Sequence, residues 1–258
     1  MPTVKFKNAD VSYTVCGKGP TLVWLHGYLE SKNIWEELII AFENDYTNVC
    51  IDLLGHGNSG VVNETHLPSL HANAVDEVLK SIGVDNCVLI GHSMGGYVSL
   101  AYLEEFPQKV SGIVLMNSTS YADSEEKKGI RKRALKIIDN KKDIYIRLGV
   151  SNLFSKESKQ NHKEAVAHIV NNALKTPTSG IKAAIKGMML RPRRTHVLKN
   201  FNGKKLIISG REDVLIDTSE SEKEAVFTNC DFKQFQGGHM TFLEDRKCLI
   251  CNLLRFLA

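Results

Sequence analysis

Ser93 lies between a strand-like run and a helical run, inside the sequence GHSMG at residues 91–95. The apolar residues 87–90 before it predict a strand, and the residues from Met94 onward predict a helix. Glycines two positions away on each side are typical of a sharp turn that presents one hydroxyl. The five-residue pattern is weak by itself, so its place between a strand and a helix is what indicates a nucleophile.

A serine hydroxyl is a poor nucleophile at neutral pH, so it needs a base and a group that orients the base. Among the nine histidines, His239 fits this role best. It follows the last strand-like run in the sequence FQGGHMTFLED, where two glycines free the backbone. A loop at the carboxyl end of a strand is also where α/β sheets place their sites.

The acid is expected at the end of another strand, before the histidine. Asp213 follows the strand-like run KKLIIS and a turn glycine, and Glu212 and Asp217 are its rivals. Three residues past that glycine, Asp213 is able to face back toward the site, whereas Asp217 suits the cap of the next helix. The other possible position, after the sixth strand, holds Asn117, which cannot carry the charge.

An acyl-transfer site also needs N–H donors for an oxyanion. The backbone amide of Met94 is one candidate because it follows the nucleophile directly. The amide of Tyr28, in the turn after the third strand, is the second. Leu153, Phe154, Met188 and Met189 are candidates for lining the substrate pocket, although apolar residues at helical spacing are more often core.

Eight β-rich runs divide the chain, and several are nearly all apolar, as expected of strands covered on both faces. Helical patterns between them predict an α/β protein with a mostly parallel sheet and helices on both faces. The first two runs are joined too closely for a crossover helix, so they should form an antiparallel hairpin. The runs are TVKFK, VSYTVC, TLVWLH, TNVCID, CVLIGH, GIVLMN, KKLIIS and DFKQF, and the helices lie at about 33–43, 66–82, 94–106, 218–227 and 241–257.

The stretch at 119–200 breaks this rhythm, because it has helical patterns and no convincing strand. We predict a core domain of residues 1–118 and 201–258, with an all-helical cap inserted after the sixth strand. Between residues 121 and 200, 19 Lys and Arg stand against 7 Asp and Glu. This excess favours either an anionic substrate or a solvated lysine-rich surface. The cap helices are expected at 125–139, 142–154, 159–174 and 178–190.

No run of 18 apolar residues is present, so a membrane span is not expected. The start, MPTVKFKNAD, lacks the pattern of a secretory signal, and the six scattered cysteines suit free thiols, so we expect a cytoplasmic protein. Cys248 and Cys251 form a C-x-x-C without a second pair at zinc spacing, and we expect them to pack in the core. The basic segment has few aromatic residues and no binding motif, which argues against nucleic acid as a partner.

Together these motifs resemble the α/β-hydrolase superfamily, in its esterase-like branch with a helical cap. The resemblance implies an eight-stranded α/β-hydrolase sheet, with Ser93 as nucleophile, Asp213 as acid and His239 as base. It also implies an oxyanion hole of Tyr28 and Met94, and no metal or organic cofactor. Related dehalogenases and epoxide hydrolases need a carboxylate at position 93, so those branches are excluded. The matching segments are HGY (26–28), DLLGHGNS (52–59), GHSMGG (91–96), GREDVLID (210–217) and GGHM (237–240).

The leading hypothesis is a serine hydrolase that acts on small carboxylic esters through an acyl-enzyme. A second hypothesis keeps the triad but has it cleave a carbon–carbon bond, or eliminate a group, in an anionic substrate. Arg191, Arg193 or Arg194 would then bind carboxylates. A third hypothesis is a slow hydrolase that serves as a ligand receptor, which a very low turnover on every ester would indicate.

Overall fold

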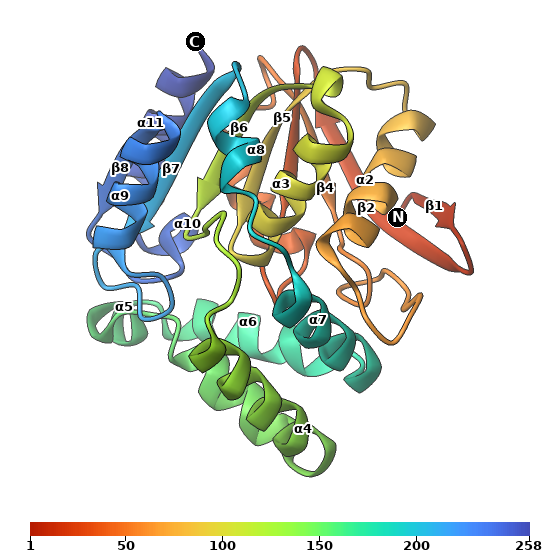
Figure 1. Cartoon of the computed structure of the whole chain (residues 1–258), viewed down its shortest axis with the longest axis vertical. Coiled ribbons are helices and arrows are strands. Elements are labelled where there is room, and N and C mark those ends of the chain that lie inside the picture. The colour runs from red at the N-terminus through yellow and green to blue at the C-terminus, as the bar shows by residue number, and fades with distance from the viewer.

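A sheet of eight strands forms the centre of the computed structural model of this chain (Figure 1). The structure describes all 258 residues except the side chain of Lys156. The strand order is β1-β2-β4-β3-β5-β6-β7-β8, and β2 runs antiparallel to both of its neighbours while every other pair is parallel. The predicted mostly parallel sheet is confirmed. Its strands are β1 Thr3–Phe6, β2 Ala9–Gly17, β3 Thr21–Leu25, β4 Thr47–Ile51, β5 Cys87–His92, β6 Val110–Met116, β7 Lys204–Gly210 and β8 Asp231–Phe235.

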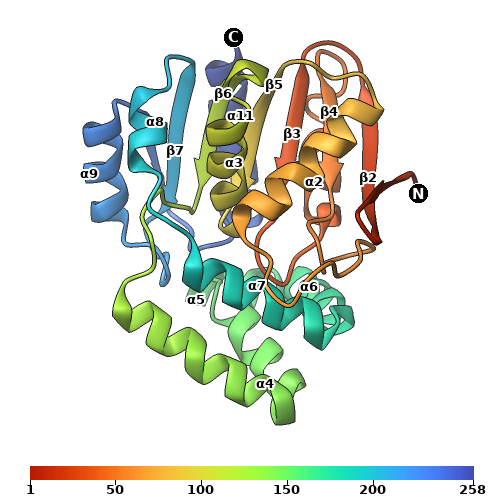
Figure 2. The same ribbon diagram turned by 45° about the vertical axis from the view of Figure 1, so that its right-hand side comes forward.

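Helices cover both faces of the sheet because its central strands are apolar on both sides. Helices α2 (Pro68–Ser81) and α3 (Met94–Glu105) lie on one face, and α11 (Arg246–Leu257) lies on the other (Figure 2). Trp24 of β3 is fully buried, with its ring centroid 5.3 Å from that of Trp35. Such packing makes the sheet a firm base for the loops at the carboxyl ends of its strands. Helix α9 (Thr218–Thr228) follows β7.

Two helices of the core differ from the sequence prediction. The helix expected at about 33–43 is a 3-10 turn, η1 (Lys32–Trp35), followed by the short α1 (Glu36–Ile39). The helix expected at 241–257 is divided into α10 (Thr241–Glu244) and α11. The break falls at Asp245, whose carboxylate accepts a hydrogen bond from the Gly237 amide at 2.7 Å and whose φ of −124° is not helical.

The expectation that Cys248 and Cys251 pack in the core is wrong. Both thiols are free and both residues are exposed on α11. The buried face of this helix instead carries Leu249 and Leu253, which are four residues apart and therefore share one side.

Between β6 and β7 the chain forms helices and, within the described residues, no strand. In both views most of this segment lies across the end of the sheet where the parallel strands finish, whereas its last helix, α8, lies alongside the sheet (Figures 1 and 2). The break predicted near Asn140 is a kink inside α4, where Lys141 has φ −139° and ψ 41°. Helix α8 was not expected. The division into a core and a cap at 119–200 stays a prediction. The helices are α4 Glu125–Ser151, α5 Lys156–Asn161, α6 Lys163–Lys175, α7 Thr178–Leu190 and α8 Thr195–Asn200.

Candidate active site

Ser93 occupies a sharp turn between β5 and α3. Its φ of +49° and ψ of −112° lie in a region that side chains other than glycine adopt only at a cost. A Cβ on Gly95 would come within 2.1 Å of the Leu25 carbonyl oxygen, and one on Gly91 within 2.5 Å of the Gly95 carbonyl oxygen. The turn therefore requires both glycines. The Ser93 side chain is half-buried, and its hydroxyl makes no hydrogen bond to another described residue.

Asp213 and His239 are in direct contact. The Nδ1–H of His239 donates a hydrogen bond of 2.8 Å to Asp213 Oδ2, and both side chains are almost wholly buried. Asp213 Oδ1 accepts the amides of Leu215 at 2.8 Å and Ile216 at 3.1 Å. Burial alone would raise the pKa of Asp213, but the charge and hydrogen bond of His239 outweigh it and lower that pKa. Asp213 is therefore a carboxylate at neutral pH.

Asn117 belongs to this site, although sequence reasoning set it aside as an uncharged residue. Its amide Nδ2 donates to Asp213 Oδ2 at 2.9 Å and to the Gly238 carbonyl at 3.2 Å. Its Oδ1 accepts the Thr241 hydroxyl at 2.5 Å. Asn117 thus ties the end of β6 to the acid and to the histidine loop. The position of Asn117 after the sixth strand indicates that it lies near the site, but only the tertiary contacts show which groups it bonds.

The carboxyl ends of four neighbouring strands bring these residues together. The Ser118 hydroxyl donates to the Ser93 carbonyl at 2.8 Å, which links the loop after β6 to the turn after β5. The imidazole of His239 lies with its ring centroid 5.0 Å from that of His92, the residue before the serine. Residues 93, 117, 213 and 239 therefore form one cluster at this edge of the sheet.

The amides of Tyr28 and Met94 lie beside the same edge, in the turn after β3 and at the first position of α3. The first amides of a helix have no acceptor within it. In the part of the chain that the structure describes, neither amide donates to a protein acceptor. Leu29 has φ +65°, so the turn that carries Tyr28 is strained as the serine turn is.

The four residues predicted to line the substrate pocket pack within or against the hydrophobic core. Phe154 and Met188 are buried, while Leu153 accepts the His239 amide through its carbonyl oxygen at 3.0 Å. Their role toward a substrate stays a prediction, as does that of Met189.

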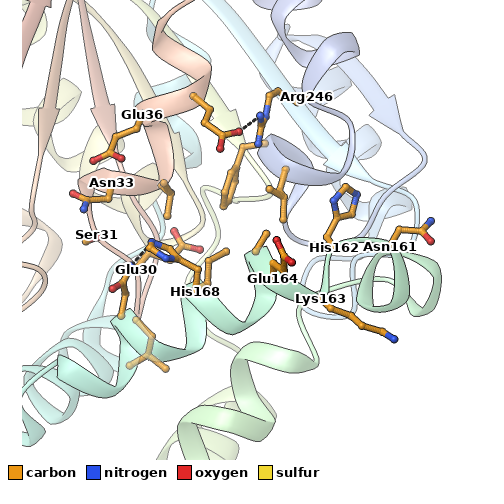
Figure 3. A pocket seen from close by; sticks show the side chains of 18 of the residues that line it. Glu30, Ser31, Asn33, Glu36, Asn161, His162, Lys163, Glu164, His168 and Arg246 are labelled. Atoms are coloured by element: carbon orange, nitrogen blue, oxygen red, sulfur yellow. Dashed lines mark hydrogen bonds and ion pairs between the residues drawn. The ribbon is translucent and has the colours of Figure 1, made fainter.

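A cavity of about 820 Å³ lies between η1 and α6, near the candidate active site (Figure 3). Glu30 and Phe242 form part of its wall beside the sheet, and His168 of α6 forms another part of the wall. Neither Ser93 nor His239 is among the described residues that line it. This cavity is therefore adjacent to the candidate active site and separate from it.

The basic charge of the helical segment is partly neutralised by ion pairs. Arg191 donates to Asp123 Oδ1 at 2.6 Å, and its guanidinium lies 3.8 Å above the centroid of the Tyr97 ring. Arg194 donates to Glu104 at 2.8 Å. Arg193 donates to the Thr195 hydroxyl and stacks on Tyr121, with no carboxylate partner among the described residues. Arg191 and Arg194 are thus engaged with acidic side chains.

No cluster of three or more His, Cys, Asp and Glu side chains suited to a metal ion occurs among the described residues. No helix within that same part of the chain is both long and apolar enough to cross a membrane.

Comparison with known proteins agrees with this architecture. Residues 20–139 match the family model described as alpha/beta hydrolase fold. An esterase from Thermogutta terrifontis superposes with a TM-score of 0.94 at 22% identity, over 100% of this chain and 98% of the other. An enol-lactonase from Burkholderia xenovorans LB400 superposes with a TM-score of 0.92 at 15% identity, over 99% of both chains. The chain therefore has the α/β-hydrolase fold.

The relatives found by sequence differ in how much of their length they share with this chain. Pyrrolizixenacetamide deacetylase from Xenorhabdus hominickii is 26% identical over 264 residues, covering 100% of this chain and 98% of that protein. For the curated relatives that match first, the alignment covers 45% of this chain and only 35% of the relative's own length. The chain is thus similar in fold to an esterase and an enol-lactonase, and similar in sequence to a deacetylase.

Proposed function

We propose that this protein is a serine hydrolase of small carboxylic esters. The observation that carries the proposal is the 2.8 Å hydrogen bond from His239 Nδ1–H to the buried Asp213 carboxylate, beside a serine held at φ +49°. Because Nδ1 carries the proton, Nε2 is left with a lone pair. That nitrogen is the base for the Ser93 hydroxyl.

In the proposed reaction, Ser93 Oγ attacks the ester carbonyl carbon and its proton passes to His239 Nε2. Asp213 stabilises the imidazolium that forms, and the amides of Tyr28 and Met94 donate to the oxyanion. The imidazolium gives its proton to the departing alcohol, and water then releases the acid from Ser93. Catalytic hydrogen bonds are often long in the free enzyme and tighten with substrate, which suits the unpaired hydroxyl of Ser93.

A fluorophosphonate probe tests the nucleophile directly. We expect the probe to label Ser93 and no other serine, because the proposal gives this hydroxyl an imidazole base and two backbone donors. Mass spectrometry of the labelled peptide identifies the residue. A panel of p-nitrophenyl esters from acetate to octanoate then measures the preferred chain length. Labelling of a different serine would contradict the assignment, and turnover far below one per minute on every ester would favour a ligand receptor.

A second candidate function, on substrates that carry an anionic group, is favoured by one buried cluster. Asp123 accepts from Arg131 Nε and from Arg191 Nη1, each at 2.6 Å, so two guanidinium groups share one carboxylate. The cluster therefore keeps one net positive charge. Arg131 also lies near the hydroxyls of Tyr28 and Tyr145: burial raises the pKa of both, and the charge of Arg131 opposes that rise. Tyr28 is the residue whose amide faces the proposed oxyanion.

Removing the charge of Arg131 should selectively weaken the binding of anionic substrates. For Arg131→Met we expect KM for p-nitrophenyl hydrogen succinate to rise about 10- to 100-fold, the usual worth of a hydrogen bond to a charged group. The neutral ester p-nitrophenyl valerate, of similar length, should change little. Arg133→Met is the matched control, because Arg133 is exposed on the same helix. Equal changes for both esters would contradict an anion subsite at Arg131.

A further inference from the structure

The imidazole of His92, the second residue of GHSMG, is buried and bonded on both nitrogens. Its Nδ1 lies 3.0 Å from Glu30 Oε2, and its Nε2 lies 2.9 Å from the backbone carbonyl oxygen of His239. Both His92 and Glu30 are at most 5% exposed. A carbonyl oxygen carries no hydrogen, so His92 Nε2 must be the donor to His239.

The other nitrogen faces an oxygen that already accepts a hydrogen bond. Glu30 Oε2 accepts the Gly27 amide at 2.5 Å, so it serves as an acceptor on that side as well. With acceptors at both nitrogens, the ring is satisfied fully only as an imidazolium that donates twice. The charged ring and the carboxylate then form a buried neutral pair, which avoids an unpaired charge in the interior.

The surroundings of the pair agree with this charge state. Burial alone would lower the pKa of His92, but the Glu30 carboxylate outweighs it and raises that pKa. Asp213 and the His239 carbonyl act in the same direction. The pKa of Glu30 is lowered, because the charge and the hydrogen bond of His92 outweigh its burial. Two more rings lie close to the imidazole of His92: that of His239, with 5.0 Å between centroids, and the apolar ring of Phe242, edge-on at 5.1 Å.

The pair joins the two loops on which the proposed reaction depends. A Cβ on Gly27 would approach Glu30 Oε2 to 2.8 Å and His92 Nδ1 to 2.9 Å, so the loop after β3 is packed directly onto the pair. The Glu30 carboxylate accepts the Gly27 amide, so it connects the two ends of the segment 27–30, which carries the Tyr28 amide. On the other side of the pair, His92 Nε2 donates to the backbone carbonyl oxygen of His239. Figure 3 shows Glu30 at the wall of the neighbouring cavity.

We propose that His92 is a positioning residue, held as an imidazolium by Glu30, that sets the oxyanion loop and the catalytic histidine at fixed positions relative to each other. The proposal deepens the hydrolase function proposed above and rests on it for its kinetic consequences. The charge state of His92 is a property of the resting protein and does not depend on any substrate.

Nitrogen-15 NMR of the histidine side chains tests the charge state in the wild-type protein. We expect both His92 nitrogens to carry a proton above neutral pH, and we expect Glu30→Gln to leave only one. A single protonated nitrogen on His92 in the wild type at neutral pH would overturn the proposal. This measurement decides the charge state whether or not the protein hydrolyses any ester.

Kinetics on p-nitrophenyl butyrate test the positioning role. For Glu30→Gln, which keeps the shape and the acceptor for Gly27, we expect kcat to fall about 10- to 100-fold with little change in KM, as small misplacements of reacting groups do. His92→Gln should behave alike, because glutamine cannot donate on both sides. Glu36→Gln is the matched control, since Glu36 is exposed on the wall of the same cavity. Unchanged kcat in folded Glu30→Gln would overturn the role.

The pH profile separates positioning from a merely structural role. Because Glu30 raises the pKa of His92, the alkaline limb of kcat should move to lower pH in Glu30→Gln and stay in place in Glu36→Gln. An alkaline limb that is the same in both variants would contradict the proposal. If the fluorophosphonate probe fails to label Ser93 even in the wild type, the hydrolase function fails, while the NMR result still decides the state of His92.

Discussion

Ser93→Ala is expected to lower kcat on p-nitrophenyl butyrate by roughly 10⁴-fold or more, with little change in KM. The reason is that the variant loses the atom that forms the acyl-enzyme, while the amides of Tyr28 and Met94 remain. Those donors sustain only the residual catalysis that an oxyanion hole gives without a nucleophile. Steady-state kinetics on the purified variant, with fluorophosphonate labelling in parallel, measure the loss.

Ser99→Ala provides the matched control for this result. Ser99 lies in the same helix, α3, and its buried hydroxyl donates to the Gly95 carbonyl at 2.9 Å. It tests whether the loss of a serine hydroxyl from this helix disturbs the turn. We expect near-normal kcat in Ser99→Ala. Activity in Ser93→Ala close to that of the wild type would remove the covalent mechanism.

The sheet could be predicted from the sequence because its signals are local. All eight strands follow from β-rich runs of four to nine residues with turn residues between them, and several of these runs, such as TLVWL at Thr21–Leu25, are nearly all apolar. The serine turn is local too, since the glycines at 91 and 95 are needed within a few residues of Ser93. Positions 213 and 239 could be proposed because each follows a strand of the same parallel sheet, and such strands end at one edge.

The supporting contacts of the site could not be predicted, because they join residues that are far apart in the chain. Asn117 and Asp213 are separated by 96 positions, and Glu30 and His92 by 62. No periodicity in the sequence encodes such a pairing. The same limit applied to Arg191: its charge was evident, but its pairing with Asp123 depended on how the helical segment folds back.

We expect the protein to lose stability in mild acid, because four of its histidines are buried. His26, His56, His66 and His71 lie at the carboxyl end of β3 and around the loop that leads into α2, and all four are at most 1% exposed. Burial lowers the pKa of each of them, to about 3 for His56 and well below its usual value for His71. Among the described residues, neither ring nitrogen of His71 has a hydrogen-bond partner.

The sign of the effect follows from proton linkage. In the unfolded chain these histidines take up protons as the pH falls through about 6.5, whereas the folded chain does not bind them until much lower pH. Their stabilising contribution is therefore present above that value and lost below it. The pKa of His92 is raised, so its contribution is complete below about 6.5 and offsets none of the loss between pH 6.5 and 5.

We therefore expect the free energy of unfolding to fall by about 2 kcal/mol for His56 between pH 7 and pH 5, and to fall further through His71, whose pKa is lowered in the same direction. Even the loss from His56 alone is a noticeable share of the ~5–15 kcal/mol by which domains are usually stable. Urea denaturation at both pH values measures the loss. His71→Leu should make the loss smaller, because that variant has no group to protonate at this position. His196→Leu, at a side chain that is 67% exposed, should leave the whole loss in place. Equal stability of the wild type at the two pH values would contradict this prediction, because it would show that the folded protein binds these protons as readily as the unfolded chain does.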